Sequence, residues 1–119
     1  MIQNRVRLPP VREAITHKFQ LGDVKGYLTV GMYEDGKPGE IFLKIDKMGS
    51  PVSGFCDAWA IAVSIMLQSG IPLEYLIGKY RGMRFPPEGL TRNQKIPIAT
   101  SAVDYVVRWL ELRFLGGKG

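Results

Sequence analysis

The sequence predicts an α+β fold, in which a small antiparallel sheet of three strands is followed by two or three helices packed on one face. Two observations predict it: apolar and polar side chains alternate between residues 15 and 45, and apolar side chains recur at helical spacing in later segments. The 119 residues suffice for one domain with a hydrophobic core. We expect a basic extended arm at residues 1–14 and a single domain at residues 15–119.

The strands are expected first along the chain. Residues 15–21 alternate with period two, and residues 26–44 form a hairpin around the turn sequence Glu-Asp-Gly-Lys-Pro-Gly. Prolines hold the preceding arm, with its three arginines, in an extended conformation. The prediction is three antiparallel strands.

The first helix is expected over residues 53–69. It is apolar almost all round, which indicates a central, buried helix, and Gly70 is its C-terminal stop. Pro72 can open a short second helix that reaches about Lys79, since proline is tolerated in the first helical turn.

A loop and a last helix complete the chain. Residues 81–95 contain closely spaced prolines and glycine and predict a loop. Apolar residues at helical spacing predict an amphipathic helix over residues 99–114, with Asp104 and Arg108 paired on its solvent-exposed face.

Charge and cysteine content limit the function classes. The chain has 16 Lys and Arg against 11 Asp and Glu, a net charge of +5, which favours an anionic partner. One cysteine, Cys56, excludes an internal disulfide and any Cys-x-x-Cys metal or redox site, so a reducing cytoplasm is the expected location. We find no apolar run of spanning length and no signal peptide, and expect no membrane partner.

The main candidate ligand site is the start of the first helix. Glycines and serines there let a ligand approach backbone N–H groups, which together with the helix dipole attract phosphate. The alternative is plain capping by a serine, with the glycines forming a tight turn. The candidate residues are Lys44, Lys47, Gly49, Ser50, Ser53 and Gly54.

Three more residues extend this candidate site. Asp57, expected in the first helical turn, can bind Arg84 or a ligand hydroxyl, or can simply be favoured by the helix dipole. Arg84 and Phe85 lie among arginines and aromatics that can hold phosphates while stacking bases. A solvated basic surface is the alternative.

His17 and Lys18, on the first strand, are also candidate ligand-binding residues. A single histidine is a poor basis for a metal site, and acid–base work would need a carboxylate such as Asp57 nearby. We expect a histidine that makes one hydrogen bond in the core. Cys56 is expected to be an inert core residue, although a place in the first helical turn would lower its pKa.

Several short stretches, in one order, resemble a known family. They include Gly26-Tyr27-Leu28-Thr29-Val30-Gly31, Gly49-Ser50, Ser53-Gly54, Asp57-Ala58 and Arg108-Trp109-Leu110. The chain resembles the C-terminal region of adenosylcobalamin-dependent (class II) ribonucleotide reductases, which is called the TSCPD domain. The resemblance covers nearly the whole chain.

The resemblance implies an accessory domain and not a reductase by itself. The large enzymes of the family place their cobalamin site, radical cysteine and reducing cysteine pair in a barrel domain that this chain lacks. One cysteine cannot supply both a thiyl radical and a dithiol. The cysteines that name the wider family are missing as well. We expect no catalytic residue and no cofactor bound by this chain.

Three function classes stay open. The first is a non-catalytic nucleotide-binding or accessory domain with phosphate at the helix start, whose partner is a reductase catalytic subunit. The second is a phage-type sponge that sequesters a cyclic nucleotide signal. The third is a single-stranded nucleic-acid module, whose affinity would fall steeply with salt. A homo-oligomer is expected, because the sheet leaves a face or an edge to cover.

Overall fold

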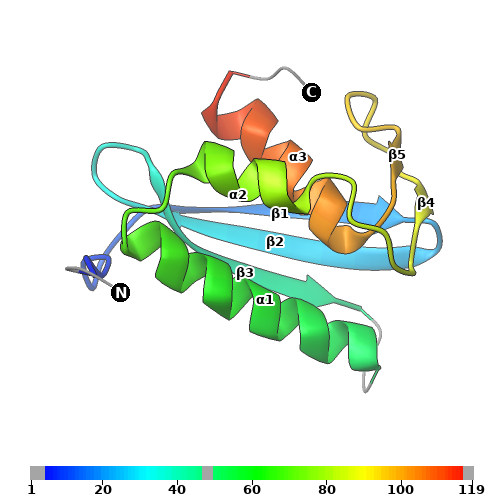
Figure 1. Cartoon of the computed structure of the whole chain (residues 1–119), viewed down its shortest axis with the longest axis horizontal. Coiled ribbons are helices and arrows are strands. Elements are labelled where there is room, and N and C mark those ends of the chain that lie inside the picture. The colour runs from blue at the N-terminus through cyan, green and yellow to red at the C-terminus, as the bar shows by residue number, and fades with distance from the viewer. Residues whose placement is uncertain (1–4, 47–49, 117–119) are drawn as a thin grey trace.

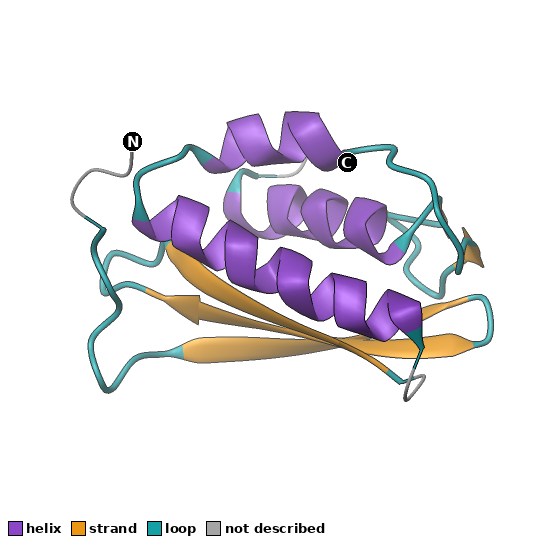
Figure 2. Ribbon diagram, turned by 60° about the horizontal axis from the view of Figure 1, so that its bottom comes forward, coloured by secondary structure: helices purple, strands orange, loops and turns teal. Residues whose placement is uncertain are grey.

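A computed structural model describes residues 5–46 and 50–116 of the chain. The elements are β1 (Ala14–Leu21), β2 (Val24–Met32), β3 (Pro38–Ile45), α1 (Pro51–Gln68), α2 (Leu73–Tyr80), β4 (Gly89–Leu90), β5 (Ile98–Ala99) and α3 (Ala102–Phe114) (Figure 1). The first three strands form an antiparallel sheet in chain order. Figure 2 shows all three helices on one face of this sheet. The predicted α+β fold is confirmed.

The inner face of the sheet builds the core. Its alternate side chains are buried under the helices: Phe19, Leu21, Leu28, Val30, Ile41, Leu43 and Ile45. Gly26 is paired with Phe19 across β1 and β2, and a side chain at Gly26 would collide with the Phe19 ring. The alternation that predicted the strands therefore also identifies the face that the helices cover.

No described element covers the opposite face of the sheet (Figure 2). Tyr27 and Phe42 are exposed there, and the hydroxyls of Thr16 and Thr29 lie 3.2 Å apart. This open face is one surface available to the expected homo-oligomer, which stays a prediction.

Helix α1 closes one edge of the sheet. The Ile41 N–H of β3 donates to Ser64 Oγ at 2.8 Å, and Gln68 Nε2 donates to the Gly39 carbonyl at 3.0 Å. These bonds satisfy backbone groups that an edge strand would otherwise expose. The other edge is β1, which within residues 5–46 and 50–116 pairs with β2 alone.

The boundaries and burial of α1 differ from the prediction. The helix begins at Pro51 and not at residue 53, because Ser50 is its N-cap. It is not buried all round: Phe55 is 48% and Ile61 61% exposed. The sheet and α2 cover only its inner side, so an apolar outer side remains in contact with solvent.

The composition of α1 also corrects the expectation that no apolar run reaches spanning length. With 18 residues and a mean hydropathy of 1.2, this helix is long and apolar enough to cross a membrane by length and composition. In the structure it packs on the sheet, with Cys56, Trp59 and Val63 buried in the shared core. Its apolar inner side serves the fold of the domain.

Helix α3 starts later than predicted. Ser101 is its N-cap and accepts the Asp104 N–H at 3.0 Å, while Ala99 belongs to β5. The predicted loop at 81–95 contains β4, which pairs with β5. Asp104 does not lie on a solvent-exposed face. The connection between α2 and α3 covers it, and its carboxylate accepts the backbone N–H groups of Gly82 and Thr100.

The described part of the arm is bound to the domain. Arg5 Nε donates to Gln68 Oε1 at 2.8 Å, and the Val6 N–H donates to the Gln68 carbonyl at 2.9 Å. Arg12 forms an ion pair with Glu40 at 2.7 Å. Residues from both ends of the arm thus contact α1 and β3.

Candidate functional site

The start of α1 is capped by its own residues. Ser50 Oγ accepts the Ser53 N–H at 3.2 Å, and the Gly54 N–H donates to the Ser50 carbonyl at 3.3 Å. Lys47 and Gly49 lie outside the described residues. The geometry matches the capping alternative, and phosphate binding at this place stays a prediction.

Two of the charged candidates lie apart from the helix start. Lys44 is paired with Tyr27 and points to the uncovered face of the sheet, away from the helices. Asp57 is exposed and lies in the second turn of α1, because the helix begins at Pro51. The dipole argument for Asp57 as a first-turn residue is therefore wrong.

The loop after α2 does return to the first turns of α1. The rings of Phe85 and Phe55 meet edge to face with centroids 5.4 Å apart. Arg84, the neighbour of Phe85, is exposed and forms an ion pair with Glu88 at 3.1 Å. The Phe55–Phe85 pair and Arg84 thus lie beside the first turns of α1.

Cys56 is buried, as expected of a core residue. Burial, and to a smaller extent the negative charge of Asp57, raises the pKa of its thiol to about 11. A thiolate is therefore scarce at neutral pH, and Cys56 is a poor nucleophile or metal ligand. No cluster of three or more His, Cys, Asp or Glu in residues 5–46 and 50–116 is arranged to hold a metal.

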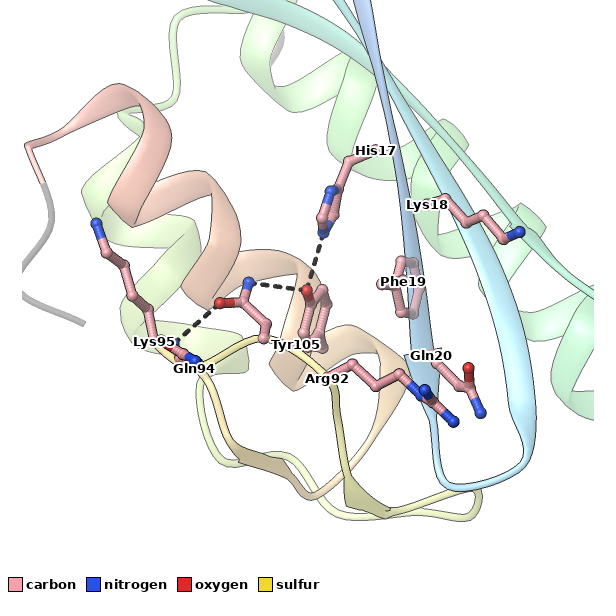
Figure 3. Close-up of a pocket in the computed structure, with 9 residues that line it drawn as sticks. His17, Lys18, Phe19, Gln20, Arg92, Gln94, Lys95 and Tyr105 are labelled. Atoms are coloured by element: carbon pink, nitrogen blue, oxygen red, sulfur yellow. Dashed lines mark hydrogen bonds between the residues drawn. The ribbon is translucent and has the colours of Figure 1, made fainter.

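A second group of polar residues surrounds His17. Its Nε2 lies 2.9 Å from the Tyr105 hydroxyl, which also accepts a hydrogen bond from Asn93 Nδ2 at 3.0 Å (Figure 3). The Lys95 N–H donates to Asn93 Oδ1 at 3.0 Å, which fixes the orientation of the amide. If the Tyr105 hydroxyl donates to His17 Nε2, each of these groups has a partner and the neutral imidazole carries its hydrogen on Nδ1; we assign this tautomer on that ground.

The same group is held by stacked rings. The Phe19 and Tyr105 rings have centroids 4.6 Å apart, and the His17 and Trp109 rings 4.8 Å apart. Burial raises the pKa of Tyr105, so its hydroxyl keeps its proton. The predicted role of His17 as a core histidine is close to what is seen, but it lies at the wall of a pocket.

The pKa of His17 is expected to lie below 6.5, because burial disfavours the imidazolium. Between the lowered pKa and 6.5, the unfolded chain binds a proton at His17 that the folded domain does not. The contribution of His17 to the free energy of unfolding is therefore fully present above pH 6.5 and is lost as the pH falls through the lowered pKa. As the sole histidine, His17 gives one unambiguous ring signal for an NMR titration. Tyr105→Phe removes a donor to the neutral ring and should raise this pKa, whereas a wild-type value at or above 6.5 would contradict the assignment.

The pocket beside His17 has a volume of about 550 Å³. It lies between β1 and the connection from β4 to β5, and its lining residues are His17, Lys18, Phe19, Gln20, Arg92, Asn93, Gln94, Lys95 and Tyr105. The sequence analysis named His17 and Lys18 as ligand-binding candidates and counted Arg92 and Lys95 only among the scattered basic residues of the arm and the long loop; it did not connect them to His17. The loop sequence Arg-Asn-Gln-Lys carries no specific signal for a pocket, because polar runs are common in surface loops.

Comparisons with known proteins identify the same family as the short sequence stretches do. Residues 3–114 match the TSCPD domain family. The chain is 47% identical over 96% of its length to a vitamin B12-dependent ribonucleotide reductase of Rhodopirellula baltica, and 48% identical over 93% to one of Streptantibioticus cattleyicolor. It spans only 11% and 18% of those two relatives. No solved structure matches. The chain belongs to the TSCPD domain family.

Proposed function

We propose that this chain is a non-catalytic accessory domain that docks on the catalytic part of a vitamin B12-dependent ribonucleotide reductase. Relatives with this name carry the matching segment within a much longer chain. The single cysteine is buried and stays protonated, so the radical and dithiol chemistry must come from elsewhere. The contribution of this domain is then contact and positioning.

The outer side of α1 supports this proposal. We call it the α1 stripe; it consists of Phe55, Ala58, Ile61, Ala62 and Ile65, which recur at helical spacing along one side. Asp57 is the only charged residue among the 18 of the helix. Solvent-exposed helix faces normally carry several charges, and an apolar exposed stripe indicates a protein interface.

The test is binding in trans. The partner is the Rhodopirellula baltica reductase with its matching segment removed, checked for folding by circular dichroism. We expect this chain to bind it and to change its activity, and Ile61→Glu to weaken binding at least tenfold, because a carboxylate would be desolvated in the contact. Ile98→Glu is the matched control, since Ile98 is 55% exposed on β5 and outside the α1 stripe.

Two results would contradict docking through the α1 stripe. One is equal binding by wild type and Ile61→Glu. The other is self-association of the wild type in sedimentation experiments that Ile61→Glu abolishes without any binding to the reductase; the stripe would then serve the homo-oligomer.

Nucleotide binding is a second candidate function. We place the phosphate at the start of α1. The contact between Phe55 and Phe85 supports this site, because it brings an aromatic pair and Arg84 to that end of the helix. A ligand at one hundred times its dissociation constant adds about 2.7 kcal/mol of stability. A thermal-shift screen would cover nucleoside phosphates, cyclic dinucleotides and single-stranded DNA.

Gly54→Ala is the sharpest variant for this screen. Apart from the adjacent residues and the backbone of α1 itself, no described atom lies within 4 Å of the added Cβ, and alanine favours helix, so without a ligand the change should stabilise the domain by up to about 1 kcal/mol. Loss of a nucleotide-induced shift in Gly54→Ala would support the helix-start site. A shift with cyclic dinucleotides only would favour a sponge, and salt-sensitive DNA binding would favour a nucleic-acid module.

A further inference from the structure

The pocket beside His17 combines three kinds of side chain that one class of ligand needs. Its basic residues are Lys18, Arg92 and Lys95, and no described lining residue is acidic. None of the three takes part in the four ion pairs of the described chain, which involve other arginines. The Lys18 side chain is directed to the other side of β1, so Arg92 and Lys95, with no carboxylate in the described lining, are the cations that favour an anion here.

The second kind is aromatic. The stacked Phe19 and Tyr105 rings and the neutral His17 imidazole form one wall of the pocket. Figure 3 shows His17 directed at Tyr105 on one side of β1 and the Lys18 side chain directed to the other side, away from the pocket. Because Phe19 and Tyr105 are only 5% and 1% exposed, the part of this wall open to a planar ring is mainly the half-buried His17 imidazole.

The third kind is the carboxamide. Gln20 and Gln94 line the pocket, and Asn93 ties the loop to Tyr105. Carboxamides offer a donor and an acceptor side by side, which matches the edge of a nucleobase. Figure 3 shows Arg92 extended toward Gln20, so a cation and an amide meet at the β1 end of the pocket.

The loop that supplies Arg92 and Lys95 is held in place by its own hydrogen bonds. The Asn93 N–H donates to Thr91 Oγ1 at 3.0 Å, and the Thr91 N–H donates to the Pro97 carbonyl at 2.9 Å. The Ile96 N–H donates to the Asn93 carbonyl at 3.0 Å. The basic side chains are thus presented from an ordered loop, which lowers the entropy cost of binding.

We propose that this pocket binds a nucleoside phosphate, with the phosphate at Arg92 and Gln20 and the base toward His17 and Gln94. The volume of about 550 Å³ suits a ligand of this size. The site is separate from the start of α1, because it lies at the β1 edge whereas α1 closes the β3 edge. The proposal concerns nucleotide binding and does not depend on docking to a reductase.

The experiment is calorimetric titration of the full chain with nucleoside mono- and diphosphates, and with pyrophosphate as the probe for a bare anion. Arg92→Ala should weaken nucleotide binding at least tenfold. Arg113→Ala, which removes an exposed arginine outside the pocket, is the matched control and should bind like wild type. Both positions are exposed, so neither change should disturb folding, which circular dichroism checks.

A second readout separates this pocket from the helix start. A nucleotide bound here should shift the NMR signal of the His17 ring, and Gly54→Ala should leave the affinity unchanged. The proposal is overturned if no nucleotide binds at millimolar concentration, if pyrophosphate binds as tightly as the nucleotides, or if Gly54→Ala and not Arg92→Ala removes binding. A preference for single-stranded DNA with a steep salt dependence would overturn it as well.

Discussion

Replacement of Asp104 by alanine is expected to lower the free energy of unfolding by about 3 kcal/mol. The Asp104 carboxylate is only 2% exposed and accepts the N–H groups of Gly82 at 2.7 Å and Thr100 at 3.0 Å. It also pairs with Arg108 at 3.2 Å. Removal leaves two backbone donors without this acceptor and a largely buried guanidinium without its carboxylate.

Thermal and urea unfolding measure this effect, and about 3 kcal/mol corresponds to a fall in Tm on the order of 10 °C. Asp57→Ala is the control, because Asp57 is exposed and has no ion pair among those described, and it should change stability by less than about 0.5 kcal/mol. A loss below about 1 kcal/mol in Asp104→Ala would mean that water replaces the carboxylate, contrary to its burial.

Gly26→Ala is the second change with a large expected effect, a loss of about 2 kcal/mol. A Cβ at this position would lie 2.8 Å from both Cε atoms of Phe19, well inside van der Waals contact. The Phe19 ring is buried and stacked on Tyr105, so it cannot turn away without displacing the wall of the pocket. The loss of stability should therefore come with a shift of the His17 NMR signal.

Gly78→Ala is the matched control for this change. Gly78 lies in α2, and beyond its neighbours and the backbone of α2 no described atom lies within 4 Å of an added Cβ, so alanine should stabilise the domain by up to about 1 kcal/mol. Urea unfolding measures both changes, and we expect the free energy of unfolding to fall in Gly26→Ala and to rise in Gly78→Ala. Equal stability of Gly26→Ala and wild type would contradict the placement of the Phe19 ring over Gly26.

The strands could be predicted from sequence because alternation and turn residues act locally. The helix starts were less predictable: Ser50 and Ser53 are both good N-caps, and only the bond from the Ser53 N–H to Ser50 Oγ decides between them. The exposure of Ile61 could not be predicted, since its apolar character does not tell how many layers cover it.

The pocket was only half predictable for a similar reason. The sequence analysis predicted one hydrogen bond for His17, but the partner is Tyr105, 88 residues away, which no local pattern connects to it. The pairing of Asp104 with Arg108 was predicted from their spacing and is present at 3.2 Å. Its burial depends on the loop that carries Gly82 and Thr100, so the expected surface pair is an internal one.

The unequal edges of the sheet limit how this domain can assemble through its strands. Ser64 and Gln68 occupy backbone groups of β3, whereas in the described part of the chain β1 has a strand partner on one side only. A second copy that paired along β1 would leave β3 at each end of the joined sheet, where the Gly39 carbonyl and the Ile41 backbone groups are already bonded to α1. Further strand addition would then have to displace these side-chain bonds, so the β1 edge is the less obstructed of the two.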